Sequence, residues 1–133
     1  MKPVSAKTNR PLPIGAVLDV VDNSGARKLK IIGVRKYGGV KKRLAAAGVA
    51  DVIVGTVKVG KPGMRKQVVL ATIIRQRKEY RRPSGIRVKF EDNAAIILTD
   101  VAGTPKGSRI KGAIAKEVVE RFPAVGKLSS VIV

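Results

Sequence analysis

The sequence predicts a mainly β protein built around a small closed barrel, and three observations predict this class. Short β-branched runs recur along the chain and are separated by turn residues such as Gly, Pro, Asn and Asp. A chain of 133 residues is long enough for one folded domain with its own core. Closing about five or six short strands into a barrel removes the unpaired edges that a small open sheet would expose.

The first two predicted strands form a hairpin. Residues 16–22 and 27–35 are rich in Val, Ile and Leu, and Asn23-Ser24-Gly25 between them is a turn sequence. In the second run Lys28 alternates with apolar neighbours, as expected for a strand with one buried face. The other predicted strands are β-branched runs bounded by turn residues, at 51–60, 66–78, 86–90 and 94–99.

One segment near the C-terminal end has the periodicity of a helix. Apolar side chains recur there every four residues, at Ile110, Ile114, Val118 and Phe122. Ser108 is a suitable N-cap, and Pro123 ends the run. We expect the apolar stripe to pack on the barrel, while the polar face fits either solvent or a partner. Residues 126–133 fit either a turn of helix or an edge strand.

The charge balance indicates a polyanionic partner. The chain has 28 Lys plus Arg against 9 Asp plus Glu, a formal net charge of +19, which a polyanion would relieve. A membrane-surface helix would set its basic residues beside Trp, Phe or Leu, whereas this chain has no Trp and two Phe. No apolar run approaches the ~20 residues of a membrane-spanning helix. The N-terminus also lacks the apolar region of a signal peptide. We therefore expect no membrane partner and a soluble, intracellular protein.

The side chains that most enzymes use are scarce. Cys and His are absent, which leaves no thiolate nucleophile and no imidazole base or ligand. The only carboxylate pairs are Asp19 with Asp22, Glu91 with Asp92, and Glu117 with Glu120. Two of these pairs lie in turn sequences and the third on the predicted helix. Residues 60–66 contain Gly and Lys without the order of a phosphate-binding loop. The sequence predicts no enzyme, no cofactor and no metal site.

Basic residues are clustered rather than interspersed. Residues 23–50 hold Lys and Arg without any acidic residue between Asp22 and Asp51, and their glycine-rich part can adapt to a phosphate backbone. In 75–89 basic residues flank the turn Pro83-Ser84-Gly85, and Glu79 is the only acid. A two-stranded ribbon without an apolar face is not stable alone in water. We favour a nucleic-acid-binding arm over a solvated surface hairpin for this ribbon.

Aromatic residues are few, which bears on how a nucleic acid would be recognised. Tyr37 and Tyr80 lie inside the two basic clusters and could each stack on a base or pack against an Arg stem. Phe90 and Phe122 lie on apolar faces and are expected in the core. The pattern predicts recognition of the shape and backbone of folded RNA rather than of base sequence.

Four motifs carry a family resemblance. They are DNSGARK (22–28), RLAAAGVADVIVGTVK (43–58), RQRKEYRRPSGIRVKFEDNAAII (75–97) and GSRIKGAIAKEVVE (107–120). From about residue 11 onward the chain resembles the family of the universal large ribosomal subunit protein number fourteen. GKPGMRK (60–66) and RQRKEYRR (75–82) resemble its archaeal and eukaryotic branch, and the absence of Cys and His fits an archaeal member.

The resemblance implies a five-stranded β-barrel with a projecting basic β-ribbon and short C-terminal helices. Residues 1–133 would form one domain, with the barrel at about 14–100, the ribbon at about 75–89 and a helical region at about 104–133. The implied function is that of a cytoplasmic, structural constituent of the large ribosomal subunit, bound to large-subunit rRNA and adjacent proteins. It would lie at the subunit interface and contribute to a bridge to small-subunit rRNA. Its C-terminal part would help to dock the anti-association factor called initiation factor six.

Site residues follow from the basic clusters and from the resemblance. The expected RNA contacts are Lys28, Arg35, Lys36, Lys41, Lys42, Arg43, Arg75, Arg77, Lys78, Arg81, Arg82, Arg87, Lys106, Arg109 and Lys111. The expected protein contacts are Ile110, Ile114, Val118 and Phe122. Two alternatives remain: a general nucleic-acid-binding protein or RNA chaperone, and a nuclease that holds Mg²⁺ on an acidic pair.

Overall fold

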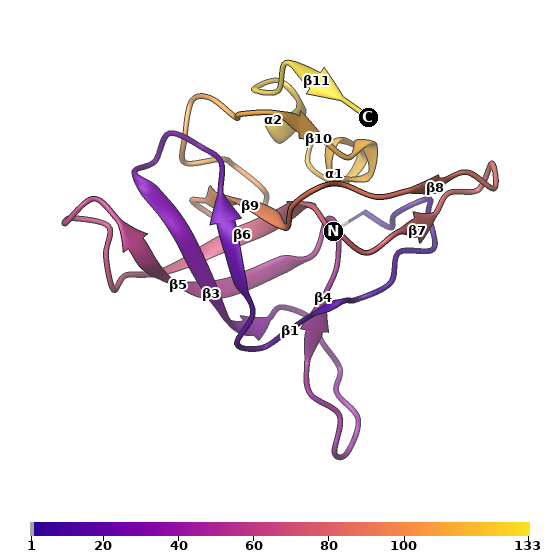
Figure 1. The fold of residues 1–133 in the computed structure, drawn as a ribbon, viewed down its shortest axis with the longest axis horizontal. Coiled ribbons are helices and arrows are strands. Elements are labelled where there is room, and N and C mark those ends of the chain that lie inside the picture. The colour runs from indigo at the N-terminus through magenta and orange to yellow at the C-terminus, as the bar shows by residue number, and fades with distance from the viewer. Residues whose placement is uncertain (1) are drawn as a thin grey trace.

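The computed structural model describes residues 2–133, and five of its strands close into a barrel (Figure 1). In barrel order the strands are β2 (Val17–Val20), β3 (Ala26–Val34), β5 (Val52–Gly60), β6 (Val68–Arg75) and β9 (Ala94–Leu98). Neighbouring strands are antiparallel, except that β2 pairs in parallel with β9 and so closes the barrel. The predicted mainly β fold with a five-stranded barrel is confirmed.

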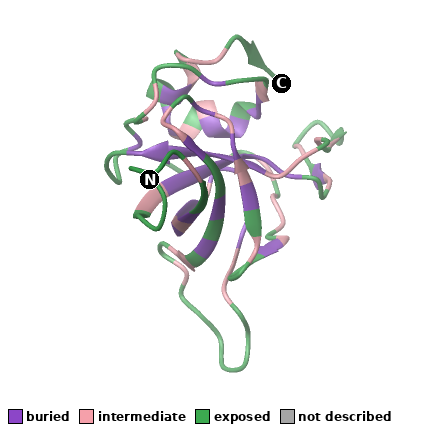
Figure 2. Ribbon diagram, turned by 60° about the vertical axis from the view of Figure 1, so that its left-hand side comes forward, coloured by how far each residue is buried: buried purple, intermediate pink, exposed green. Residues whose placement is uncertain are grey.

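Two apolar cores explain why some strands are apolar on both faces. One core fills the barrel, and the other lies between the outside of the barrel and the C-terminal elements. Ile73 and Ile74 are adjacent on β6 and both fully buried, Ile73 in the first core and Ile74 in the second. Ile97 and Ile96 divide in the same way on β9. A continuous apolar run is expected where both faces of a strand are covered. Figure 2 shows the buried residues in purple.

The C-terminal region folds over the second core. It contains β10 (Ala113–Ile114), α1 (Lys116–Arg121), α2 (Pro123–Gly126) and β11 (Val131–Ile132). Strands β10 and β11 pair in parallel. Of the two structures that the sequence left open for residues 126–133, the tail therefore forms the short strand, and helix α2 ends where the tail begins. These elements lie together at the top of Figure 1.

The predicted helix is much shorter than its apolar period suggested. Gly112 has a φ of +81°, which is incompatible with a continuing α-helix. Ile110 and Ile114 reach the second core from extended backbone, because Ile110 bridges to Asp22 and Ile114 belongs to β10. The N-cap of α1 is therefore Ala115 and not Ser108. Helix α1 ends just before Pro123, as the sequence predicted, and α2 begins there.

The basic ribbon leaves the barrel where β6 ends. Its strands β7 (Tyr80–Arg81) and β8 (Arg87–Val88) are shorter than predicted and project to the right in Figure 1. The β6–β9 register shifts between Ile73 and Arg75, and such a bulge bends the strand that carries it. A short pair, β1 (Leu12–Pro13) with β4 (Ala46–Ala47), similarly supports the base of the loop that follows β3.

The N-terminal segment fastens the root of the ribbon. The Lys7 amide donates to the Arg81 carbonyl (3.2 Å), and the Asn9 amide side chain donates to the Glu79 carbonyl (2.8 Å). The fully buried Gln76 donates to the Asn9 side-chain oxygen (2.6 Å) and accepts from a backbone amide. Contacts with the N-terminal segment of the same chain therefore contribute to the stability of the ribbon.

Candidate nucleic-acid interface

Three exposed basic surfaces surround the barrel. The loop surface consists of Arg35, Lys36, Lys41, Lys42 and Arg43; the ribbon surface of Arg77, Lys78, Arg81 and Arg87; and the C-terminal loop surface of Lys106, Arg109 and Lys111. All of these residues are exposed, and within residues 2–133 only Arg87 among them forms an ion pair. The cationic groups are thus presented to solvent.

The loop surface lies on the segment between β3 and β4, which projects away from the barrel (Figure 2). Lys36, Gly39 and Lys42 all have positive φ, so the chain turns sharply several times without forming a regular element. The Arg43 amide closes a tight turn by donating to the Val40 carbonyl (3.0 Å). These turns hold the basic side chains at the end of a long projection.

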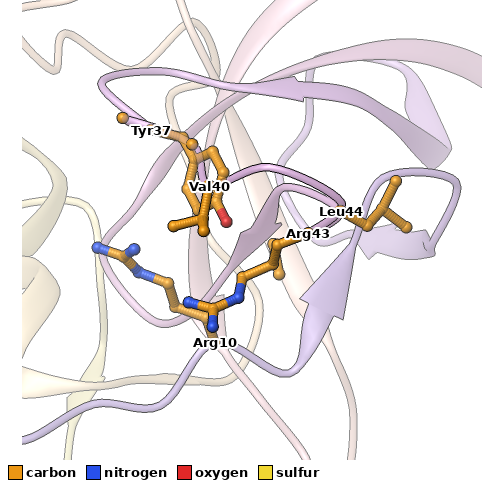
Figure 3. Close-up of a pocket in the computed structure, with 8 residues that line it drawn as sticks. Arg10, Tyr37, Val40, Arg43 and Leu44 are labelled. Atoms are coloured by element: carbon orange, nitrogen blue, oxygen red, sulfur yellow. The ribbon is translucent and has the colours of Figure 1, made fainter.

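A hollow of about 510 Å³ lies beside this loop. Its walls include Tyr37, Val40 and Arg43 from the loop and Arg10 from the N-terminal segment (Figure 3). The Arg10 guanidinium lies over the Tyr37 ring, 5.8 Å from its centroid. Tyr37 thus packs against an Arg, which was one of the two arrangements predicted for it. Arg10 was not among the predicted residues, because its position depends on the two-residue pairing of β1 with β4.

The ribbon surface contains one weak ion pair. Arg87 donates to a Glu79 carboxylate oxygen at 3.1 Å, and their side chains are 63% and 44% exposed. Exposed pairs of this kind contribute about 0–1 kcal/mol, so Arg87 can exchange its partner at little cost. Arg81 lies on the same ribbon, is exposed and has no acidic partner in the described residues. The guanidinium groups of Arg81 and Arg87 are therefore available to an anionic partner.

Arg82, in contrast, belongs to a buried network. Its guanidinium donates to both carboxylate oxygens of Glu117 (2.8 and 3.2 Å), and the Tyr80 hydroxyl donates to the same carboxylate (2.8 Å). Glu117 is fully buried and the Arg82 side chain is 13% exposed. Burial raises the pKa of Tyr80 above its ordinary value, and the hydrogen bond to Glu117 raises it further. The network joins the ribbon to helix α1.

Arg75 is also an internal residue. It forms a two-pronged ion pair with Asp92 (2.8 and 3.0 Å) and donates to the carbonyls of Lys111 and Ala113. Gly112 makes this possible, since a β-carbon there would lie 2.6 Å from an Arg75 nitrogen. Arg75 is 9% exposed. Arg75 and Arg82 were both predicted to contact RNA. In the structure Arg75 is buried and Arg82 is half-buried, and each guanidinium makes several hydrogen bonds within the protein.

The C-terminal loop surface is held against the turn between β2 and β3. The Asn23 side-chain oxygen accepts from the amides of Ser108 (2.8 Å) and Arg109 (3.3 Å). The Asp22 carboxylate accepts from the Ile97 amide (2.9 Å), which fixes the turn on the barrel. Lys28 lies on the outside of β3 in an exposed ion pair with Asp19 (3.0 Å). The turn at residues 22–25 thus orients Arg109 and its basic neighbours.

Members of all three acidic pairs make structural contacts. Asp19 pairs with Lys28 and Asp22 anchors the turn, Asp92 pairs with Arg75, and Glu117 pairs with Arg82. Glu120 accepts a hydrogen bond from the Ser5 hydroxyl (2.9 Å). Within residues 2–133, no three His, Cys, Asp or Glu side chains gather where they could hold a metal ion. In the same residues no helix has the length and apolar character needed to cross a membrane.

The predicted protein contacts are buried. Ile110, Ile114, Val118 and Phe122 are 4%, 0%, 0% and 2% exposed and belong to the second core. The expectation that this stripe packs on the barrel is confirmed. The same burial leaves these four side chains no surface for another protein in this structure. The apolar residues exposed nearby are Val131, Ile132 and Val133, which the sequence analysis did not single out.

The barrel and its exposed cations define a small, strongly basic β-barrel protein. The family model described as "Ribosomal protein L14p/L23e" matches residues 12–133. Over all 133 residues the chain is 53% identical to "Large ribosomal subunit protein uL14" of Nanoarchaeum equitans (strain Kin4-M), with both chains fully covered. It is also 53% identical, again with full coverage, to the protein of that name from Methanothrix thermoacetophila. The chain therefore belongs to the ribosomal protein L14p/L23e family.

Membership confirms the resemblance found in the motifs. A protein of this family is a structural part of the large ribosomal subunit in the cytoplasm and not an enzyme. Its partners are accordingly the RNA and the proteins of the ribosome.

Proposed function

We propose that the protein binds large-subunit rRNA through the loop surface, the ribbon surface and the C-terminal loop surface. The observation that carries this proposal is the exposure of their basic side chains, nearly all without acidic partners in the described residues. Each cation that neutralises a phosphate releases condensed counterions, which favours binding at moderate salt. We leave Arg75 and Arg82 out of the proposed contact set, because their guanidinium groups form ion pairs with Asp92 and Glu117.

The finer assignments follow from the family resemblance. We infer that the protein lies on the face of the large subunit that meets the small subunit, and that it contributes to a bridge to small-subunit rRNA. The C-terminal part, from Ile110 onward, would contact other large-subunit proteins and initiation factor six. The exposed apolar residues Val131, Ile132 and Val133 support a protein contact there. Adjacent apolar side chains that are exposed to solvent often mark a site of protein interaction.

Sedimentation tests the proposal directly. A tagged protein is followed through sucrose gradients of a cell lysate at moderate and at high salt. Co-migration with the large subunit that survives high salt is expected for an integral component. A protein at the top of the gradient, or one washed off early, would contradict it. In a second assay, equal affinity for rRNA, bulk tRNA and duplex DNA would favour a general nucleic-acid-binding protein or RNA chaperone.

A further inference from the structure

The hollow beside the loop surface combines an aromatic face with two cations. Tyr37, Arg10 and Arg43 contribute to its walls, and Val40 adds an apolar side chain (Figure 3). No acidic side chain lines it. Its volume of about 510 Å³ lies within the range of small-molecule sites, about 300–1,000 Å³. An anionic ligand with a flat, partly apolar body would satisfy all of these walls.

Gly38, one of the residues that line the hollow, is not required by the packing of the protein itself. A β-carbon added to Gly38 would meet no atom within 4 Å, and its φ is not positive. Another residue could therefore stand there without strain. Glycine elsewhere often permits the close approach of a ligand to the backbone. Its presence beside Tyr37 leaves one wall of the hollow open to something from outside.

Two side chains of the hollow are also unusually free. Val40 is 58% exposed, although it is apolar and belongs to neither core. The Arg10 side chain is 59% exposed and reaches the Asp51 carboxylate only at 4.0 Å, so this ion pair holds it weakly. Arg10 can therefore move from the Tyr37 ring at little cost.

We propose that this hollow receives one unpaired base of the rRNA, stacked on the Tyr37 ring, with Arg10 and Arg43 on the flanking phosphates. The inference rests on the proposed function and adds to it a base contact, the second of the two arrangements that the sequence left open for Tyr37. Bases stack on aromatic side chains in single-stranded regions, and an Arg plane can cover the same base. We expect a nucleotide to bind in this hollow more favourably than a protein side chain would, because its flanking phosphates give both cations a partner.

Substitutions at Tyr37 separate stacking from charge. Tyr37→Ala should lower the affinity for large-subunit rRNA about tenfold while leaving the dependence of affinity on salt unchanged. Tyr37→Phe keeps the ring and should bind like the wild type. Arg43→Gln should instead lower the slope of log affinity against log salt by about 0.7–0.9, because it removes a phosphate contact. Unfolding temperatures of all three variants should match the wild type, since the loop lies outside both cores.

A matched pair of glycine variants tests the space itself. Gly38→Ala should weaken rRNA binding, because the added methyl group enters the hollow. Gly63→Ala is the control: it too meets no atom within 4 Å, has no positive φ, and lies in the turn between β5 and β6. Ultraviolet cross-linking of the wild-type complex should join Tyr37 to a single unpaired nucleotide, and Tyr37→Ala should abolish that product.

The outcomes distinguish this inference from the proposed function. If the wild type prefers rRNA over tRNA but Tyr37→Ala and Gly38→Ala bind unchanged, the base site is wrong and the rRNA function stands. If the wild type binds tRNA equally well while Tyr37→Ala weakens both, the rRNA assignment fails and the stacking site remains. Cross-linking to paired nucleotides, or to Arg43 alone, would also overturn the base site.

Discussion

Two adjacent arginines, Arg81 at the end of β7 and Arg82 directly after it, have opposite surroundings. Arg81 is exposed and has no acidic partner in the described chain, whereas Arg82 joins the buried Glu117 and Tyr80. Successive residues of a strand point to opposite sides, so one arginine faces solvent and the next faces helix α1. Residue type and sequence position therefore cannot assign the role, but burial can.

Arg82→Met should destabilise the fold strongly. It would leave the fully buried Glu117 carboxylate with only the Tyr80 hydroxyl as its side-chain partner. Breaking a buried pair in this way typically costs about 3–5 kcal/mol. Urea denaturation followed by circular dichroism measures the loss. Arg87→Met is the matched control, because its ion pair with Glu79 is exposed and should cost about 0–1 kcal/mol. Equal losses in the two variants would refute the structural role of Arg82.

Arg81→Ala should show the reverse behaviour. Removing an exposed cation should leave the free energy of unfolding within about 0.5 kcal/mol of the wild type. The slope of log affinity for rRNA against log salt should fall by about 0.7–0.9 if Arg81 contacts one phosphate. Mobility-shift titrations at several salt concentrations measure it. A slope equal to that of the wild type would mean that Arg81 contacts no phosphate.

At the scale of elements, the barrel strands and the end of helix α1 were predictable, but the start of the helix was not. Alternation and turn residues identified the barrel strands, because a residue repeat of two reports directly on a buried face. The apolar repeat of four between Ile110 and Phe122 indicated one helix, yet its first half is extended around Gly112. Ile110 and Ile114 reach the second core from extended backbone, whereas Val118 reaches the same core from a helix. An apolar repeat of four cannot distinguish these two kinds of backbone.

The basic site was predictable only where charge lies on exposed loops. The loop surface and the C-terminal loop surface are exposed as expected for RNA contacts. The ion pairs of Arg75 and Arg82 could not be predicted, because their acidic partners, Asp92 and Glu117, lie 17 and 35 positions along the chain. Arg10 was missed for a similar reason, since its neighbour Tyr37 is brought near by tertiary pairing. Local sequence carries no record of such distant contacts.

Asn9→Ala should loosen the ribbon without unfolding the barrel. Asn9 connects the N-terminal segment to the Glu79 carbonyl and to the buried amide of Gln76. Leaving a buried donor without this partner costs about 1–3 kcal/mol. Hydrogen exchange at the amides of β7 and β8 should become faster, while exchange in β5 stays slow. Thr8→Ala serves as the control, because no side-chain hydrogen bond of Thr8 is found in residues 2–133. Unchanged ribbon exchange in Asn9→Ala would show that the N-terminal segment gives no support.

At the scale of the whole molecule, the basic surfaces point in different directions. The loop after β3 projects downward in Figure 1, and the ribbon projects to the right. If both surfaces bind RNA, as we propose, they would contact it at separate places.

The net charge of +19 should make the free protein more stable as salt is added. Self-repulsion among exposed cations opposes the compact state, and at an ionic strength of 0.1 M it is screened beyond about 10 Å. Each 1 kcal/mol of repulsion relieved should raise the unfolding temperature by roughly 2–8 °C in calorimetry. A variant with Lys41, Arg109 and Lys111 changed to Gln should start from a higher unfolding temperature at low salt and respond less. These three residues are exposed and unpaired within residues 2–133. If the unfolding temperature of the wild type stays constant or falls as salt is added, repulsion among its cations does not destabilise the free protein. The ribosomal partner would then have no such repulsion to relieve.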